Sequence, residues 1–191
     1  MRENRNINKL KLISLLLILF VILGIIIVNM GRLVVETIYP RQYDELVEEN
    51  ASAFDIDEAL LYAVIKTESG FDKEAVSSVG AKGLTQITPD TFIWLQTKTG
   101  EDYEEDALFE PEISIFYGAY FLNMLLDEFD NIETALAAYH AGRGIVNEWL
   151  EDPELSPDGV VLEKIPYEDT AGYVKKVMKN IERYEKIYDL D

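Results

Sequence analysis

The stretch DEALLYAVIKTESGF, residues 57–71, decides the fold. Its apolar residues recur at helical spacing and form one stripe, made of Leu60, Leu61, Val64 and Ile65. Asp55 or Asp57 can cap this helix at its start, because a short acidic side chain accepts hydrogen bonds from the first free N–H groups. The helix is predicted to run through Thr67 or Glu68 and to end at Gly70.

The carboxyl group of Glu68 lies where burial is expected. Glu68 follows Val64 by four residues and therefore shares the apolar face of the helix. It also lies in the last turn, where the negative end of the helix dipole disfavours a carboxylate, so burial and dipole should both raise its pKa. A general acid needs such a pKa near neutral pH. A glutamate at a helix end is usually only solvated, so position alone does not establish catalysis.

Further helices are predicted downstream from capping residues. Thr88 caps a helix that has Pro89 at its first position and runs toward Gly100. Pro111 opens another, in which apolar residues recur at helical spacing through Leu125.

The C-terminal half continues in the same way. Asn131 caps a helix that ends before Gly142, and an amphipathic helix follows from Asp169 to Tyr188. No segment alternates for long as a half-buried strand would. The sequence therefore predicts an all-α fold.

Residues 12–28, LISLLLILFVILGIIIV, form the longest apolar run of the chain. With Asn29 and Met30 it approaches the roughly 20 residues that a helix needs to cross a bilayer. Basic residues precede it: Arg2, Arg5, Lys9 and Lys11. Since basic residues stay on the cytoplasmic side, we expect a single-pass anchor with a cytoplasmic N-terminus and an extracytoplasmic body.

Two alternatives to a retained anchor are less consistent with the sequence. A cleaved signal peptide is disfavoured, because the apolar run is long and no small-residue cleavage site follows it. A buried core helix is disfavoured, because a helix that is apolar on every face would lack neighbours to cover it in so small a protein. The expected organisation is a basic segment at 1–11, an anchor at 12–30, a connector at 31–50 and one domain at 51–191.

The amino-acid composition excludes several kinds of partner and of catalytic or metal site. From Arg32 onward the chain carries 13 basic and 35 acidic residues, a difference of −22. So acidic a body would be repelled by nucleic-acid phosphates, and nucleic acid is excluded as a partner. The chain has no cysteine, which removes disulfides, thiolate nucleophiles and cysteine-based zinc sites. No cluster with the spacing of metal ligands is visible, so neither a metal nor a cofactor is expected.

Four motifs in order resemble the soluble lytic transglycosylase family, which has a lysozyme-like catalytic domain. They are ESGF at 68–71, SSVGAKGLTQITP at 77–89, ALAAYHAGRGIVNEWL at 135–150 and IPYEDTAGYVKKV at 165–177. The resemblance covers nearly all of residues 54–188. Several motifs in the right order and spacing are more specific than any one of them.

The resemblance implies a role for each matching residue. Glu68 takes the place of the family's sole catalytic acid and base, and Ser77 that of a serine that supports the reacting centre. Gln86 and Tyr139 match residues of the sugar groove, and Asp169 replaces the glutamate of the last motif. Without the motifs, Ser77 could equally be a turn residue, Gln86 a residue leading into a helix and Tyr139 ordinary core.

Three positions depart from the family pattern. Thr85 stands in place of a methionine expected near the sugar, and Arg143 stands in a loop that is otherwise set by proline. His140, the only histidine, replaces an asparagine and is included in the expected substrate-binding set. An asparagine substitute that makes one hydrogen bond is favoured for His140 over a proton shuttle. These departures bear on substrate preference more than on reaction type.

The resemblance implies a reaction that uses a single acid. Glu68 would protonate the oxygen linking MurNAc to GlcNAc and then accept the proton of the MurNAc C6 hydroxyl as it attacks C1. The product would be 1,6-anhydroMurNAc in peptidoglycan. Two alternatives stay open, which are hydrolysis by a muramidase and a scaffold that binds glycan without cutting it. Protein partners are not indicated.

Overall fold

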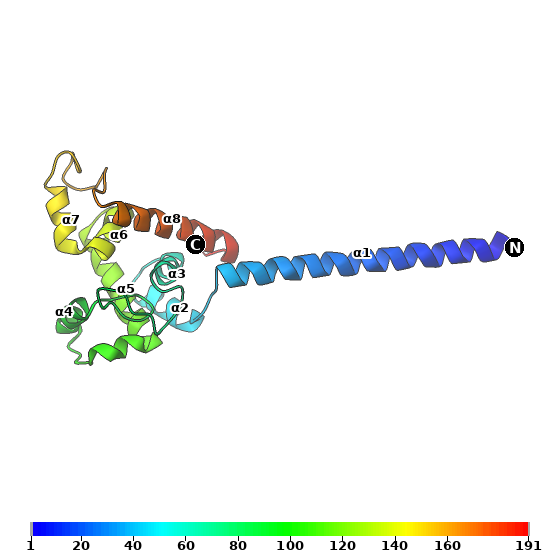
Figure 1. The fold of residues 1–191 in the computed structure, drawn as a ribbon, viewed down its shortest axis with the longest axis horizontal. Coiled ribbons are helices and arrows are strands. Elements are labelled where there is room, and N and C mark those ends of the chain that lie inside the picture. The colour runs from blue at the N-terminus through cyan, green and yellow to red at the C-terminus, as the bar shows by residue number, and fades with distance from the viewer. Residues whose placement is uncertain (1, 191) are drawn as a thin grey trace. The chain divides into compact units, whose positions relative to one another are not determined.

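The computed structural model describes residues 2–190, with side chains described for residue 13 and for 15–190. Helices make up all of its regular structure, and this range contains no strand (Figure 1). The elements are α1 (Arg2–Ile38), α2 (Asp44–Ala53), α3 (Glu58–Glu68), α4 (Pro89–Thr99), the 3₁₀ helix η1 (Glu105–Phe109), α5 (Pro111–Glu128), α6 (Ile132–Ala141), α7 (Arg143–Leu150) and α8 (Glu168–Tyr188). The predicted all-α class is confirmed. The chain forms two units, Met1–Pro40 and Arg41–Asp191.

The first unit is the single helix α1. Its stretch Leu15–Ile38 has a mean hydropathy of 2.6, is 24 residues long and buries none of its most apolar part. The stretch is thus long and apolar enough to cross a membrane, as expected for residues 12–30. Arg32 and Glu36 form an ion pair of 2.6 Å one turn apart near its end. The basic side chains expected to set the orientation, in residues 1–11, lie outside the described part of the chain.

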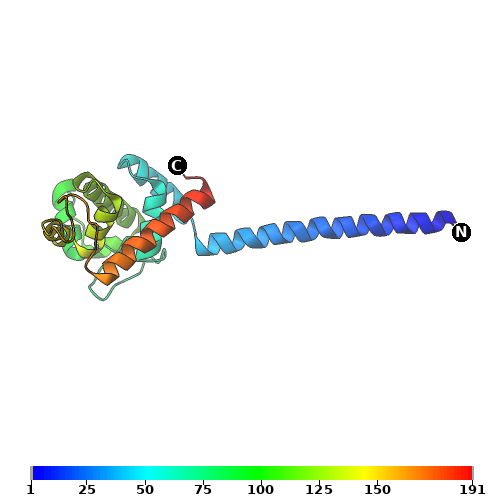
Figure 2. The same cartoon turned by 90° about the horizontal axis from the view of Figure 1, so that it is seen from above.

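The second unit is built around α3. Every residue of 59–65 is buried, so α3 is enclosed on all faces and not only along the predicted stripe. Its most extensive partner is α8, and α2 packs against both α3 and α5. Helix α6 packs against α5, α7 and α8. Figure 2 shows α8, coloured orange to red, as a long helix along the outside of this unit.

The predicted capping residues occupy the predicted positions. Asp57 accepts hydrogen bonds from the N–H groups of Ala59 and Leu60 at the start of α3. Thr88 caps α4 and Asn131 caps α6 in the same manner. Since a capping bond satisfies a donor that the helix cannot, each start is fixed by local chemistry.

Two regions differ from expectation. The compact unit begins at Arg41 and includes α2, which lies within the expected connector, because Val47, Asn50 and Ala51 are buried against the rest of the unit. Helix α7 begins at Arg143, in a segment expected to be a loop. Gly142 precedes it with φ 99°, a backbone angle that glycine adopts without strain, and this allows α7 to begin directly after α6.

Candidate active site

Glu68 lies at the C-terminal end of the enclosed helix α3, partly buried. Burial raises the pKa of its carboxyl from 4.5 to about 7. The hydroxyl of Tyr173 and the charge of Lys176, both on α8, lower this pKa by smaller amounts. The group is therefore present in both protonation states near neutral pH, as a residue that first donates and then accepts a proton requires.

Ser69 holds the end of α3 against the loop that follows. Its hydroxyl contacts the carbonyl oxygens of Ile65, at 3.2 Å, and Leu84, at 2.8 Å, and accepts a hydrogen bond from the N–H of Phe71. These bonds tie the helix end that carries Glu68 to residues 15 positions further along the chain. Sequence reasoning missed this role, although Ser69 follows Glu68 directly in the ESGF motif.

A cavity of about 190 Å³ opens beside the Glu68 carboxyl. Its walls are Glu68, Ser77, Val79, Ala81, Gln86, Thr88, Tyr139 and His140. Five of the six predicted site residues are thus brought together from three separate parts of the sequence. Glu68 is the only carboxylate among the described residues that line this cavity.

Ser77 and Gln86 both shape the loop that forms one wall of this cavity. The Ser77 hydroxyl accepts a hydrogen bond from the N–H of Ala81 at 3.0 Å, which makes it a turn residue as well as a lining residue. Gln86 has a left-handed backbone, with φ 50°, and its amide nitrogen donates to the carbonyl oxygens of Ala75 and Gly83. Both residues therefore have structural roles in the loop whose other surface faces Glu68.

The side chain of Thr85 points away from the cavity. It is fully buried, and its hydroxyl donates to the carbonyl oxygen of Ser114 on α5 at 2.8 Å. Its methyl group lies so close to Gly118 that a Cβ there would collide with it. The expectation that Thr85 would alter the fit of a sugar does not agree with this position, since the threonine fills a space inside the core.

His140 lies in the last turn of α6 and packs against the start of α8, where Asp169 is found. The His140 ring contacts the Thr170 hydroxyl through Nδ1 at 3.1 Å and stacks on the Tyr173 ring with centroids 4.5 Å apart. Burial lowers its pKa, against an opposing effect of Asp169. A neutral ring with one hydrogen bond supports the interpretation of His140 as an asparagine substitute. Asp169 is exposed and does not line the cavity, and its negative charge acts on the His140 ring, which does.

Tyr173 lies next to Glu68, although the sequence analysis gave it no role in the motif at 165–177 that contains it. Its hydroxyl is buried, and among the described residues it has no partner with good hydrogen-bond geometry. Burial and the negative charge of Glu68 raise the pKa of this phenol well above 10. The hydroxyl therefore stays protonated and is available to donate to the Glu68 carboxylate or to a ligand.

A second cavity, of about 350 Å³, adjoins the first and shares Thr88, Tyr139 and His140 with it. Its other walls include Trp94, Phe121 and Arg143. The Arg143 guanidinium lies 5.8 Å from the centre of the Trp94 ring and is held by Glu128 in an ion pair of 2.6 Å. Together the cavities form a groove with an aromatic end and an acidic end. The sequence did not identify Trp94 as a site residue, because none of the four motifs contains it.

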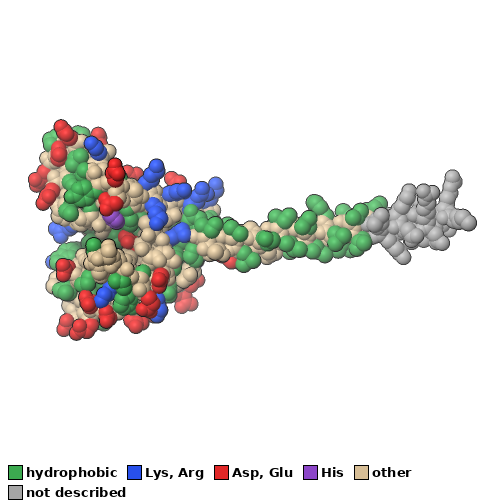
Figure 3. Space-filling model, viewed as in Figure 1, with side chains coloured by type: hydrophobic (Ala, Val, Ile, Leu, Met, Phe, Trp, Pro, Cys, Tyr) green, Lys and Arg blue, Asp and Glu red, His purple; other side chains and the backbone are tan. Residues whose placement is uncertain are grey.

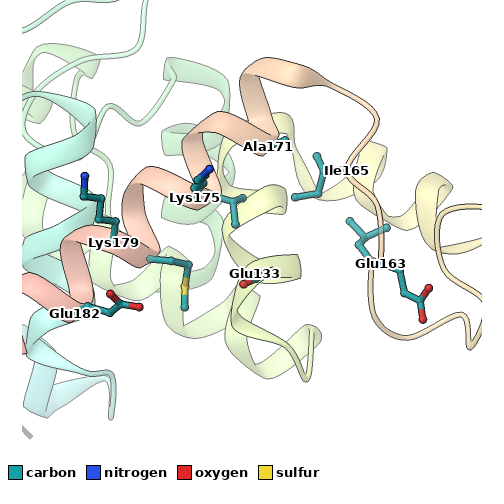
Figure 4. A pocket seen from close by; sticks show the side chains of 10 residues that line it. Glu133, Glu163, Ile165, Ala171, Lys175, Lys179 and Glu182 are labelled. Atoms are coloured by element: carbon teal, nitrogen blue, oxygen red, sulfur yellow. The ribbon is translucent and has the colours of Figure 1, made fainter.

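Figure 3 shows the one histidine, in purple, within a hollow between two lobes of the compact unit. A larger cavity, of about 560 Å³, lies on another flank of α8 between Glu133, Ile165 and Lys179 (Figure 4). It contains none of the predicted site residues. No group of three or more potential ligands that could hold a metal ion exists among the side chains that the structure describes.

The motif resemblance implied a lysozyme-like domain, and an all-helical unit with one partly buried carboxyl at the end of its enclosed helix agrees with it. The model of one family, the Transglycosylase SLT domain, matches residues 45–158, and the chain belongs to this family. The resemblance noted in the motifs is confirmed.

Similar proteins agree with this family. The soluble lytic murein transglycosylase of Salmonella typhimurium is 35% identical over 144 residues, which cover 73% of this chain and 22% of that protein. The membrane-bound lytic murein transglycosylase C of Actinobacillus pleuropneumoniae is 31% identical over 167 residues, or 75% of this chain and 46% of its own length. The chain thus spans about a fifth to a half of these relatives.

Solved structures show the same fold. The 70 kDa soluble lytic transglycosylase of Escherichia coli superimposes with a TM-score of 0.72 at 30% identity, over 81% of this chain and 26% of that one. An inactive mutant of the lytic transglycosylase of Pseudomonas aeruginosa gives a TM-score of 0.68 at 26% identity, over 80% and 25% of the two chains.

Proposed function

We propose that this protein cuts the glycan strands of peptidoglycan as a lytic transglycosylase, with Glu68 as its acid and base. The observation that carries the proposal is the carboxyl of Glu68, whose pKa is raised to about 7 in a groove of a domain of this family. The names of the relatives, lytic murein transglycosylases, support the same substrate.

The chemistry begins with the protonated carboxyl of Glu68. It donates its proton to the oxygen that links MurNAc to GlcNAc, and the bond from that oxygen to C1 breaks. The resulting carboxylate then accepts the proton of the MurNAc C6 hydroxyl as the C6 oxygen bonds to C1. The product is a 1,6-anhydroMurNAc end, and Glu68 regains its proton. A pKa near 7 suits both steps, since neither protonation state is strongly favoured.

The lining of the groove supports this route over hydrolysis through two carboxylates. Glycosidases that use water or a covalent intermediate place two carboxylates across the scissile bond, about 5 to 9.5 Å apart. Among the described residues that line the two adjoining cavities, Glu68 is the only carboxylate. Asp72 and Glu74, the nearest acids in the sequence, are exposed. The substrate's own hydroxyl, held in place, can supply the nucleophile with a high effective concentration.

The other groove residues take binding roles in this proposal. The aromatic end at Trp94 and Phe121 offers ring surface to a sugar. Ser77 lines the cavity beside the acid, and the buried Tyr173 hydroxyl acts on the Glu68 carboxyl. Gln86, Tyr139 and His140 contact the sugar that occupies the smaller cavity. Asp169 supports His140 from outside the groove.

We further propose that α1 anchors the enzyme as a single-pass span, with a cytoplasmic N-terminus and the compact unit outside. The apolar stretch Leu15–Ile38 and the basic residues before it support this topology. Protease added to intact cells stripped of their wall should digest the compact unit. Full protection of a membrane-bound chain would contradict the orientation, and a shortened soluble form would instead indicate a cleaved signal.

Digestion of purified glycan in ¹⁸O-labelled water tests the reaction. The full chain in detergent should release ends that carry 1,6-anhydroMurNAc without the label, each lighter than a reducing end by one water. Labelled reducing MurNAc in the first products would show that the protein hydrolyses the bond as a muramidase and is not a lytic transglycosylase. Binding without any cleavage would leave a glycan-binding scaffold.

A further inference from the structure

One face of α8 carries a group of five basic side chains. It consists of Lys175, Lys176, Lys179, Arg183 and Lys186, which we call the α8 basic stripe. At 3.6 residues per turn these five side chains fall within an arc of roughly 100° and along roughly 16 Å of helix. All five are exposed, and the arc lies opposite the side on which Tyr173, Val177 and Tyr184 are buried.

The stripe stands out against the charge of the rest of the chain. It holds five of the 13 basic residues found from Arg32 onward, in a region with 35 acidic ones. Nevertheless none of the five forms an ion pair with any residue that the structure describes. In Figure 3 the blue side chains gather over α8, while red ones are spread over the remaining visible surface. Unpaired cations grouped on an acidic protein indicate an anionic partner outside the chain.

Figure 4 shows how two members of the stripe are displayed. Lys175 and Lys179 project from the same side of α8, one turn apart. Both border the cavity of about 560 Å³ on the flank of the helix. Three acids, Glu133, Glu163 and Glu182, also line this cavity, so a polyanion would be repelled from its interior. The stripe therefore suits a flat anionic surface better than a ligand held within the cavity.

The stripe ends where the compact unit is joined to α1. Arg41 is the first residue of this unit, and its guanidinium lies 5.3 Å from the centre of the Tyr188 ring at the end of α8. Only Tyr39 and Pro40 separate Arg41 from Ile38, the last residue of the apolar stretch. Three residues reach at most roughly 10 Å. If α1 spans a bilayer, the Lys186 end of the stripe cannot move far from the bilayer surface.

We propose that the α8 basic stripe binds the anionic lipid headgroups of the membrane in which α1 is anchored. This inference rests on the proposed anchoring and is independent of the reaction at Glu68. The short connection keeps the lipid surface at a high effective concentration, so several weak contacts between lysine or arginine and phosphate suffice. The rest of the domain is acidic and is repelled by the same lipids, so α8 is the side that turns to the membrane. Binding fixes the orientation of the groove and directs cleavage to glycan close to the membrane.

Fluorescence quenching in nanodiscs tests this orientation. The chain has no cysteine, so one fluorophore can be attached at Gly172→Cys, a position on the stripe's side of α8 where an added side chain meets nothing within 4 Å. The full chain is placed in nanodiscs of phosphatidylcholine alone or with an equal part of phosphatidylglycerol, each with a quencher on the headgroups. Quenching should be at least about twofold stronger with phosphatidylglycerol and should weaken at 1 M salt, where charges are screened beyond about 3 Å. A fluorophore at Ile93→Cys on α4 should show no such difference.

Matched charge variants separate the stripe from net charge. The double variant Arg183→Gln and Lys186→Gln should lose the effect of phosphatidylglycerol. The double variant Lys73→Gln and Lys164→Gln changes net charge equally and should retain it. Both leave the groove intact, so glycan cleavage in detergent should equal that of the wild type.

Two results would overturn the proposal. One is equal quenching in the two lipids when the chain is inserted in both. The other is a stripe-dependent association with a soluble polyanion such as polyglycerol phosphate but not with phosphatidylglycerol discs, which would assign the stripe to a wall polymer. Failure to enter phosphatidylcholine discs would count against the anchor, and failure to cut glycan would count against the enzyme. The two proposals are thus tested separately.

Discussion

The hydroxyl of Tyr139 donates a hydrogen bond of 2.8 Å to the main-chain carbonyl oxygen of Thr85. This bond joins α6 to the loop that forms the opposite wall of the groove, across 54 positions of sequence. The two walls beside Glu68 are thus held together by one side chain, and the groove is preformed before any sugar binds.

Removal of this hydrogen bond should lower the stability of the fold by a measurable amount. Tyr139→Phe leaves the Thr85 carbonyl unpaired in the interior, so the free energy of unfolding should fall by about 1 to 3 kcal/mol. Tyr173→Phe is the matched control, because its buried hydroxyl has no well-formed partner to lose. It should cost clearly less. Urea denaturation of both variants measures the difference, and equal losses would argue against a role of the Tyr139 bond.

Glu68→Gln should abolish glycan cleavage. The amide has nearly the shape of the carboxyl but cannot donate a proton of similar acidity, so turnover should fall by at least about 10²- to 10⁴-fold. Glu74→Gln changes the same chemical group at an exposed position and should retain full turnover. Muropeptide release from purified glycan provides the measurement. Wild-type turnover in the Glu68 variant would assign the chemistry to another residue.

The same substitution should stabilise the fold at high pH. Because burial raises the pKa of Glu68 from 4.5 to about 7, the folded state keeps a proton in this window that the unfolded state has lost. Stability therefore falls as pH rises from 4.5 to 7, by up to about 3 kcal/mol. Glu68→Gln removes this loss, so its advantage over wild type should be absent below pH 4.5 and largest above pH 7. Thermal unfolding at the two extremes tests this, and a variant less stable than wild type at pH 8 would refute it.

The pH dependence of cleavage should report the pKa of Glu68. The acid form starts the reaction, so kcat/KM should decline above pH 7 by about tenfold per unit. Lys176 lowers the pKa of Glu68, and Lys176→Gln should therefore move the decline to higher pH. Lys175→Gln removes an equal charge from the neighbouring position, which does not act on the Glu68 carboxyl, and should leave the profile in place. A decline that moves equally in both variants would indicate a general effect of net charge.

Gly118 tests the packing under the loop. A Cβ at this position in α5 would collide with the side chain of Thr85, so Gly118→Ala should destabilise the protein by about 1 to 3 kcal/mol. Gly172→Ala places the same methyl on α8 in open space and should stabilise it by about 0.5 to 1 kcal/mol, since alanine favours a helix. Opposite signs are expected in parallel denaturation experiments. A neutral Gly118→Ala would mean that Thr85 can move aside.

Local chemistry explains which parts of the structure could be predicted. Asp57, Thr88 and Asn131 act within three residues of their own positions, so the helix starts that they cap can be read from the chain. Glu68 could be found because the apolar spacing of α3 already places it on a buried face. The motifs then identified Ser77, Gln86 and Tyr139, which the structure places together around one cavity.

The remaining features depend on contacts between distant segments. Ser69 bonds to Leu84, and Trp94 meets Arg143 only after the chain has folded. Nothing in the sequence indicated that Thr85 points away from the sugar, because the direction of its side chain depends on a hydrogen bond to Ser114 on α5, 29 residues further along the chain. Asp169 illustrates the opposite case, since its motif position is clear and yet its side chain lies outside the groove.

The two hydrogen bonds that the Gln86 side chain makes within its loop determine which hydrogen bonds it can still make to a ligand. Its amide nitrogen has two N–H donors, and the carbonyl oxygens of Ala75 and Gly83 occupy both. Only the amide oxygen remains, and it can accept but not donate. A sugar held there must present a hydrogen of its own, as an acetamido N–H or a hydroxyl does, whereas a bare ether or carboxylate oxygen finds no partner at this position. In its proposed contact with a sugar, Gln86 could therefore only accept a hydrogen bond, because the loop it supports already holds both of its N–H donors.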